Sequence, residues 1–105
     1  MKTSATHDLA WAQLAGLFSR LASAEHEHDD GARDYVSDTV VADIARITLR
    51  NQGLLGLDVA DYCNVLARLA VSSRGHLLRR ELAYAQVRAF VETLVRLSAG
   101  SSTAR

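Results

Sequence analysis

Residues 11–21 read WAQLAGLFSRL and carry the clearest apolar pattern of the chain. The large apolar side chains recur at spacings of three and four residues, at Trp11, Leu14, Phe18 and Leu21. This spacing follows the 3.6-residue period of an α-helix, so all four side chains fall on one face. Thr6 stands where an N-cap is expected, and Asp8 suits the positive end of the helix dipole. The sequence therefore predicts an amphipathic helix over residues 8–23.

The same helical pattern returns in three later segments, at about residues 32–51, 59–73 and 76–98. Their apolar stripes include Val36, Val40, Ile44 and Ile47, then Val59, Tyr62, Cys63, Leu66 and Leu69, then Ala83, Val87, Phe90, Leu94 and Leu97. The chain contains no proline, so no residue forces a break inside these helices. Period-two alternation of β-branched residues, which is typical of strands, is absent from the sequence. We therefore expect an all-α fold, a small four-helix bundle in one domain over residues 1–105.

Glycine and acidic residues mark the expected ends of these helices. Gly53 is expected to end the second helix in a left-handed conformation, and Gly100 is expected to end the fourth. Asp58, followed three residues later by Asp61, resembles a capping box at the start of the third helix. Three segments are expected to be exposed and flexible, namely the ends at about 1–6 and 99–105 and the polar loop at about 25–31.

The 12 basic and 12 acidic side chains give a net charge of zero. A neutral chain is not expected to bind nucleic acid or an anionic membrane over its whole surface. The charges are unevenly placed, however, because residues 1–53 carry a balance of minus three and residues 54–105 a balance of plus three. An acidic half and a basic half can attract each other within one molecule or across a dimer.

Cys63 is the single cysteine, so the chain cannot form an intrachain disulfide. Its position on an apolar stripe predicts a buried, unreactive thiol, as is common in a reducing cytoplasm. No apolar run is long enough to cross a bilayer, and the first residues lack the apolar stretch of a signal peptide. The 17 alanines, and 11 arginines against one lysine, indicate a GC-rich bacterial genome. We therefore expect a cytoplasmic bacterial protein without a membrane partner.

The segment 76–98 is apolar over more of its circumference than one buried face requires. The extra surface is covered either by neighbouring helices, if this helix is central, or by a second copy of the chain. We expect a homodimer that acts by binding another protein, as an adaptor or an anti-activator of a regulator. The apolar residues expected on the binding surface are Tyr84, Val91, Val95, Leu54, Leu55 and Leu57.

Residues 58–65, DVADYCNV, suggest an alternative function. They resemble the first helix of the helix-turn-helix in the Crp/Fnr regulator family, with Ala60 as the small residue at the helix crossing. Asn64 stands in place of the turn glycine, because asparagine tolerates left-handed geometry. Beyond Val65 the sequence departs from the family pattern, since its apolar period continues through the expected turn. The resemblance implies a DNA-binding transcriptional regulator whose phosphate contacts would come from Arg68, Arg74, Arg79 and Arg80.

A second alternative is a metal-binding helical protein. His26 and His28 lie among carboxylates in the polar loop, and imidazole with carboxylate can bind zinc, nickel or copper. Two histidines on a flexible loop do not by themselves define a preformed tetrahedral site. The sequence carries no glycine-rich phosphate loop and no recognisable Ser-His-Asp or Cys-His arrangement. We therefore expect no enzyme activity and no cofactor.

Overall fold

The structure is a computed structural model that describes residues 2–24, 26, 29–73 and 77–103. Within these residues it contains five helices and no strand, which confirms the all-α fold. The helices are α1 (Lys2–Ala24), α2 (Asp30–Arg50), α3 (Gln52–Leu55), α4 (Leu57–Ser72) and α5 (Leu77–Thr103). The four long helices correspond to the four predicted segments, and α3 is an additional single turn.

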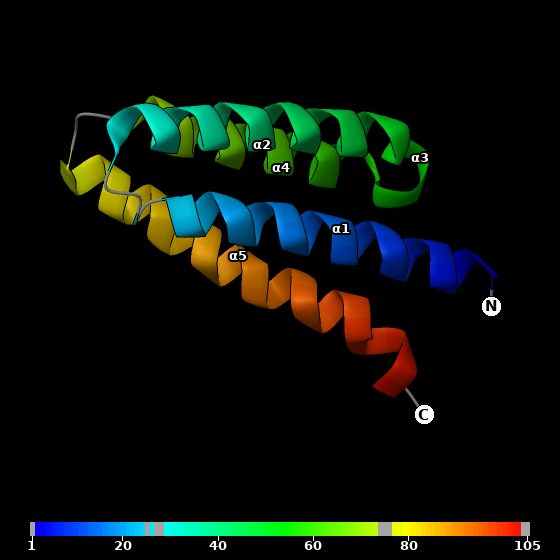
Figure 1. Ribbon diagram of the computed structural model, residues 1–105. Coiled ribbons are helices and arrows are strands. Elements are labelled where there is room, and N and C mark those ends of the chain that lie inside the picture. The colour runs from blue at the N-terminus through cyan, green and yellow to red at the C-terminus, as the bar shows by residue number, and fades with distance from the viewer. Residues whose placement is uncertain (1, 25, 27–28, 74–76, 104–105) are drawn as a thin grey trace.

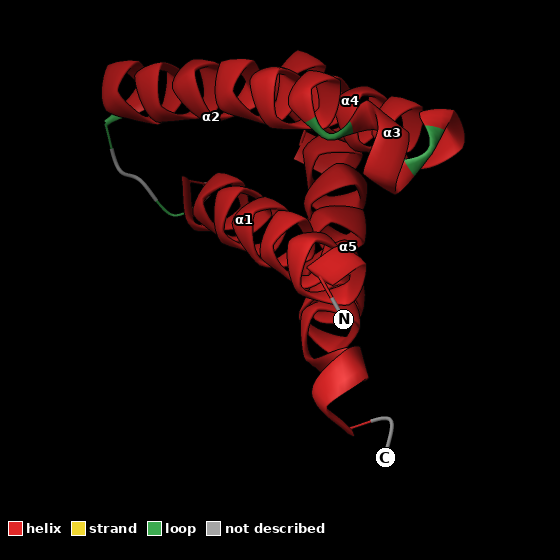
Figure 2. Ribbon diagram, turned by 90° about the vertical axis from the view of Figure 1, so that its right-hand side faces the viewer, coloured by secondary structure: helices red, strands yellow, loops and turns green. Residues whose placement is uncertain are grey.

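The long helices form two layers, with α2 and α4 in one and α1 and α5 in the other (Figure 1). Consecutive long helices run in opposite directions, and α3 joins α2 to α4 at one end of the bundle (Figure 1). The view turned by 90° again shows the α2–α4 layer above the α1–α5 layer (Figure 2). The contact between α1 and α5 is the most extensive, and that between α4 and α5 is the slightest of the four neighbouring pairs. This is the antiparallel bundle that short connections favour.

The apolar stripes predicted from the sequence form the core. Leu14, Phe18 and Leu21 of α1 are fully buried, whereas Trp11 is only partly buried against them. The other fully buried large side chains on the stripes are Val40, Ile44, Cys63, Val87 and Leu94. Every long helix therefore contributes part of its predicted stripe to one common interior. Three residues of the predicted stripes are exposed instead, namely Tyr62, Leu69 and Leu97.

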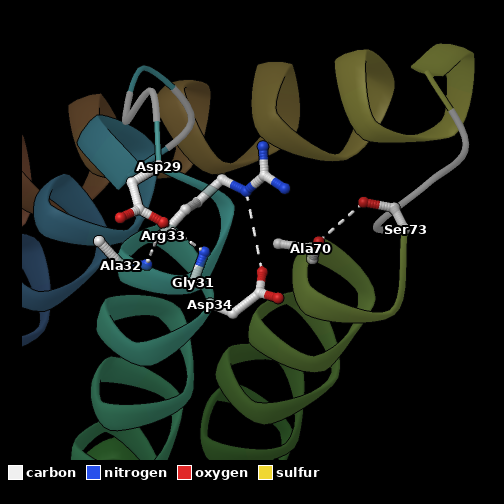
Figure 3. Close-up of polar contacts among 7 residues, drawn as sticks. All are labelled: Asp29, Gly31, Ala32, Arg33, Asp34, Ala70 and Ser73. Carbon is white, nitrogen blue, oxygen red and sulfur yellow. Dashed lines mark hydrogen bonds and ion pairs between the residues drawn. The ribbon is translucent and has the colours of Figure 1, made fainter.

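The start of α2 differs from the sequence prediction. Asp29 is the N-cap, and its side chain accepts hydrogen bonds from the backbone N–H of Gly31 at 2.9 Å and of Ala32 at 3.3 Å (Figure 3). These bonds satisfy N–H groups that have no partner inside a helix. The last residues of the predicted polar loop therefore form the first turn of α2.

The junction between α2 and α4 also differs. Gly53 lies inside α3 and does not end a helix, because α2 already ends at Arg50. Gly56 is the one described residue with a positive φ, at 89°, and it separates α3 from α4. α4 then begins at Leu57, so Asp58 lies in its first turn and makes no cap. The predicted capping box is wrong because the turn at Gly56 starts the helix two residues earlier.

The outer ends of the bundle are more helical than expected. α1 begins at Lys2, so Thr6 lies within the helix and is not its N-cap. α5 continues past Gly100 to Thr103. A glycine inside a helix costs about 1 kcal/mol relative to alanine, which weakens a helix without necessarily ending it. Residues 2–6 and 99–103, which the sequence assigns to flexible ends, thus extend α1 and α5, and the remaining residues of these segments lie outside the described part of the chain.

Candidate functional site

α5 carries apolar side chains on two opposite faces. Ala83, Val87 and Leu94 lie on the face that is buried in the bundle. The opposite face carries apolar residues at spacings of four, three and four, namely Leu78, Leu82, Ala85 and Ala89. Leu78 is 75% exposed and Leu82 is 71% exposed. One helix therefore buries one apolar stripe and leaves a second one in solvent.

α4 carries an exposed apolar strip beside its buried face. Tyr62, Val65 and Leu69 recur at spacings of three and four residues, so they lie on one side of the helix. Tyr62 is 49% exposed, Leu69 is 45% exposed, and Val65 is still more exposed. The sequence predicts one buried stripe that includes Tyr62 and Leu69, but in the structure these two are exposed, whereas Cys63 and Leu66 beside them reach the core.

A groove lies between the exposed stripe of α5 and Leu69 of α4. It has a volume of about 590 Å³ and is lined by Leu69 of α4 and by Arg79, Leu82, Ala83, Ala85, Gln86 and Ala89 of α5. Apart from Arg79 and Gln86, these lining residues are apolar. We define the α4–α5 surface as Tyr62, Val65, Leu69, Leu78, Leu82, Ala85 and Ala89.

Aromatic contacts connect Tyr62 of this surface to the core. The ring of Tyr62 meets the ring of Phe90 edge-to-face, with centroids 4.9 Å apart. Phe90 in turn meets Phe18 edge-to-face at 5.1 Å. Each such pair contributes about 0.5–1.5 kcal/mol beyond simple burial of area. Tyr62 is therefore held in place from beneath, although half of it remains exposed.

Most of the surface predicted from the sequence lies elsewhere or is covered. Tyr84 is 3% exposed and Leu55 is also buried, because both pack into the core cluster, so neither can contact a partner in this structure. Val91 is partly buried against the same cluster, and Leu54 is half-buried. Only Val95 and Leu57 are exposed as expected.

The sequence carries a signal for the exposed stripe of α5. The spacing of Leu78, Leu82, Ala85 and Ala89 is as regular as that of the buried stripe of α5. Two apolar stripes on opposite sides of one helix indicate two covering surfaces, of which a monomer supplies one. The broad apolar arc of this helix is visible in the sequence, but the structure exposes Leu78 and Leu82 and buries Tyr84.

The helix-turn-helix expected from residues 58–65 is not formed. α4 runs unbroken from Leu57 to Ser72, so Asn64 is helical and starts no turn. Its side-chain Nδ2 donates to the backbone carbonyl of Ala60 and to Thr48 Oγ1, both at 3.0 Å. Of the four predicted arginines, Arg68 and Arg79 are exposed, Arg80 is half-buried, and Arg74 lies outside the described residues.

The two histidines proposed for a metal are not both described. His26 is exposed in the turn after α1, and His28 lies outside the described residues. Asp29, from the same acidic segment, uses its carboxylate to cap α2. Across the part of the chain that the structure describes, no three side chains of the ligating types gather in one place.

Cys63 is buried, as the sequence predicted. Burial raises the pKa of its thiol from 9.0 to about 11, and a backbone hydrogen bond opposes this shift only in part. The thiolate is the reactive form of cysteine, so at neutral pH this thiol is a poor nucleophile and a poor metal ligand. Cys63 therefore acts as a small core residue.

The described helices include none with the length and apolar character needed to cross a membrane. No known family model matches the chain, and comparisons with curated proteins and with solved structures find no similar protein.

Proposed function

We propose that this chain is a protein-binding regulator, of the adaptor or anti-activator type, with no catalytic role of its own. The α4–α5 surface receives an amphipathic helix of its partner. The observation that carries this proposal is the apolar groove between Leu69 and Leu82, at the slightest of the neighbouring helix contacts. The buried thiol of Cys63 and the preference for arginine over lysine support a place in a bacterial cytoplasm.

The spacing of the exposed apolar residues suits a helix as the occupant of the groove. An amphipathic helix docks through apolar side chains at positions i, i+3, i+4 and i+7, and the exposed stripes of α4 and α5 have the same spacing. Covering an exposed leucine side chain such as Leu82 contributes about 1.5–3 kcal/mol. Arg79 lines the groove, so a carboxylate on the rim of the incoming helix would face a cation.

The test compares two leucines that are equally exposed. Leu82 and Leu49 are each 71% exposed, but only Leu82 lines the groove. Partners captured from the native host by the wild-type chain are identified by mass spectrometry, purified, and titrated against each variant by calorimetry. We expect Leu82→Glu to weaken binding by about tenfold or more and Leu49→Glu to change it by less than about twofold.

Circular dichroism of both variants checks that the fold is retained, which is expected because both leucines face solvent. Equal affinity of wild-type and Leu82→Glu chains for every captured partner would refute the proposal. An equal loss in both variants would also refute it, because the effect would then not belong to the groove.

A further inference from the structure

The exposed strip of α4 has the pattern of a helix that pairs with another helix. Three apolar residues, Tyr62, Val65 and Leu69, follow the spacing of three and four that is typical of a coiled-coil seam, with polar Asp58 and Ser72 at its two ends. Beside the seam, Asp61 and Arg68 are seven residues apart and therefore lie on the same flank of α4. Both are exposed, and within the described residues neither takes part in an ion pair or hydrogen bond.

The order of these two charges allows two copies of α4 to form ion pairs when the helices are antiparallel, but not when they are parallel. In two antiparallel helices related by a two-fold axis, side chains on the same flank of each seam face one another. With Tyr62 of one copy packed against Val65 of the other, Asp61 of each copy comes beside Arg68 of the other. A parallel arrangement would instead put the charged flank of each copy opposite the other flank of its partner, where buried Leu66 lies, so that neither pair forms.

We propose that two copies of the chain associate by packing α4 against α4 in antiparallel orientation, with two Asp61–Arg68 pairs flanking Tyr62 and Val65. The same contact covers part of the α4–α5 surface, and self-association therefore limits the access of a partner helix. The second statement rests on the proposed function, whereas the first does not. Partner binding is then regulated by the concentration of the chain. At low concentration the chain is monomeric and its α4–α5 surface is accessible, whereas at high concentration dimerisation covers part of that surface.

Charge reversal offers a test that a nonspecific apolar contact would fail. Sedimentation equilibrium at low salt measures the dissociation constant of the dimer. Asp61→Arg and Arg68→Asp each replace two attractive contacts by two repulsive ones, and each is expected to raise that constant by about tenfold or more. The double variant Asp61→Arg/Arg68→Asp restores opposite charges across the axis and is expected to return the constant to within about threefold of wild type.

Mixing the two single variants is the sharpest arm of the experiment. One chain then carries two arginines and the other two aspartates on this flank, so the mixed dimer contains two attractive pairs. We expect the mixture to dimerise more tightly than either variant alone, and added salt to reduce this difference by screening. Both substitutions are at exposed positions, and circular dichroism confirms that each variant is folded.

The outcomes separate the two proposals. A wild-type chain that is monomeric at all concentrations overturns the inference, as does a mixture that associates no better than its components. If the wild-type chain is monomeric but still binds a purified partner in a Leu82-dependent way, the proposed function stands and the inference about the dimer fails. If the dimer shows the expected charge pattern but no partner requires Leu82, the inference stands and the proposed function fails.

Discussion

The environment of Cys63 determines how its thiol responds to pH. The side chain is fully buried on the inner face of α4, where loss of hydration disfavours the thiolate. An unfolded thiol has a pKa of 9.0, whereas that of the folded chain is about 11. Folding therefore favours the protonated form. Its contribution to stability is complete below about pH 9 and is lost as the pH rises through about 11.

This pH dependence can be measured by substitution. Between pH 8 and pH 11, the wild-type chain should lose on the order of 2 kcal/mol of unfolding free energy more than Cys63→Ala does. Urea unfolding followed by circular dichroism supplies both values. All other side chains are the same in both proteins, so the difference isolates Cys63. Parallel losses in the two chains would contradict the assigned cause.

Gly56 and Gly53 give a second prediction at the level of single residues. A Cβ atom at either position would meet no neighbouring atom within 4 Å, so any difference between them comes from the backbone. Gly56 has φ 89° and ψ 151°, a region that is accessible essentially only to glycine, whereas Gly53 is helical. Gly56→Ala should lower the unfolding free energy by about 2 kcal/mol. Gly53→Ala should raise it by about 0.5 kcal/mol.

Thermal and urea unfolding of the two alanine variants check both signs. If both variants lost a similar amount of unfolding free energy, the two glycines would have the same role, which would contradict the different φ values that the structure gives them.

At the level of helices, a buried polar contact joins α2 to α4. Thr48 is buried, donates to the carbonyl of Ala45 at 3.0 Å, and accepts a hydrogen bond from Asn64. A hydrogen bond between two uncharged groups contributes about 1 kcal/mol net, but an unpaired buried partner costs more than that. The contact therefore fixes how α2 and α4 are aligned.

A double-mutant cycle measures this contact. Asn64→Ala leaves the Thr48 hydroxyl with one partner fewer and should cost about 1–2 kcal/mol of unfolding free energy. Asn64→Ala/Thr48→Val should cost less than the sum of the two single changes, with a coupling of about 1 kcal/mol. Strictly additive losses in urea unfolding would mean that the two side chains do not interact.

The helices were predictable from the sequence, whereas several of their ends were not. The stripe at Leu14, Phe18 and Leu21 is a property of spacing alone, and it is the part of the prediction that the structure confirms most directly. An N-cap instead depends on which polar side chain reaches a free N–H group. Asp29 reaches two of them, whereas Asp58 lies inside α4 and caps nothing. Sequence spacing cannot rank such competing caps.

For the molecule as a whole, the functional surface was less predictable than the core. The sequence shows that α5 is apolar on several sides, but the side that faces inward is decided by contact with α1 and α4. Tyr84 is buried and Leu82 is exposed because of that choice. The resulting bundle measures 44 × 25 × 21 Å, and its radius of gyration of 14.1 Å exceeds the roughly 13 Å of a compact domain of this length.

The two apolar faces of α5 also bear on how the chain reaches its native state. During collapse the helix can turn either face inward, since Leu78 and Leu82 are as apolar as the residues that are finally buried. The two orientations differ chiefly in the volume of the side chains that they bury. The face that is buried in the structure carries the large residues Phe90 and Leu94, whereas the exposed face carries only Ala85 and Ala89 at the corresponding places. The native orientation is therefore selected by how well large side chains fill the interior, and the reversed helix is a competing, frustrated state.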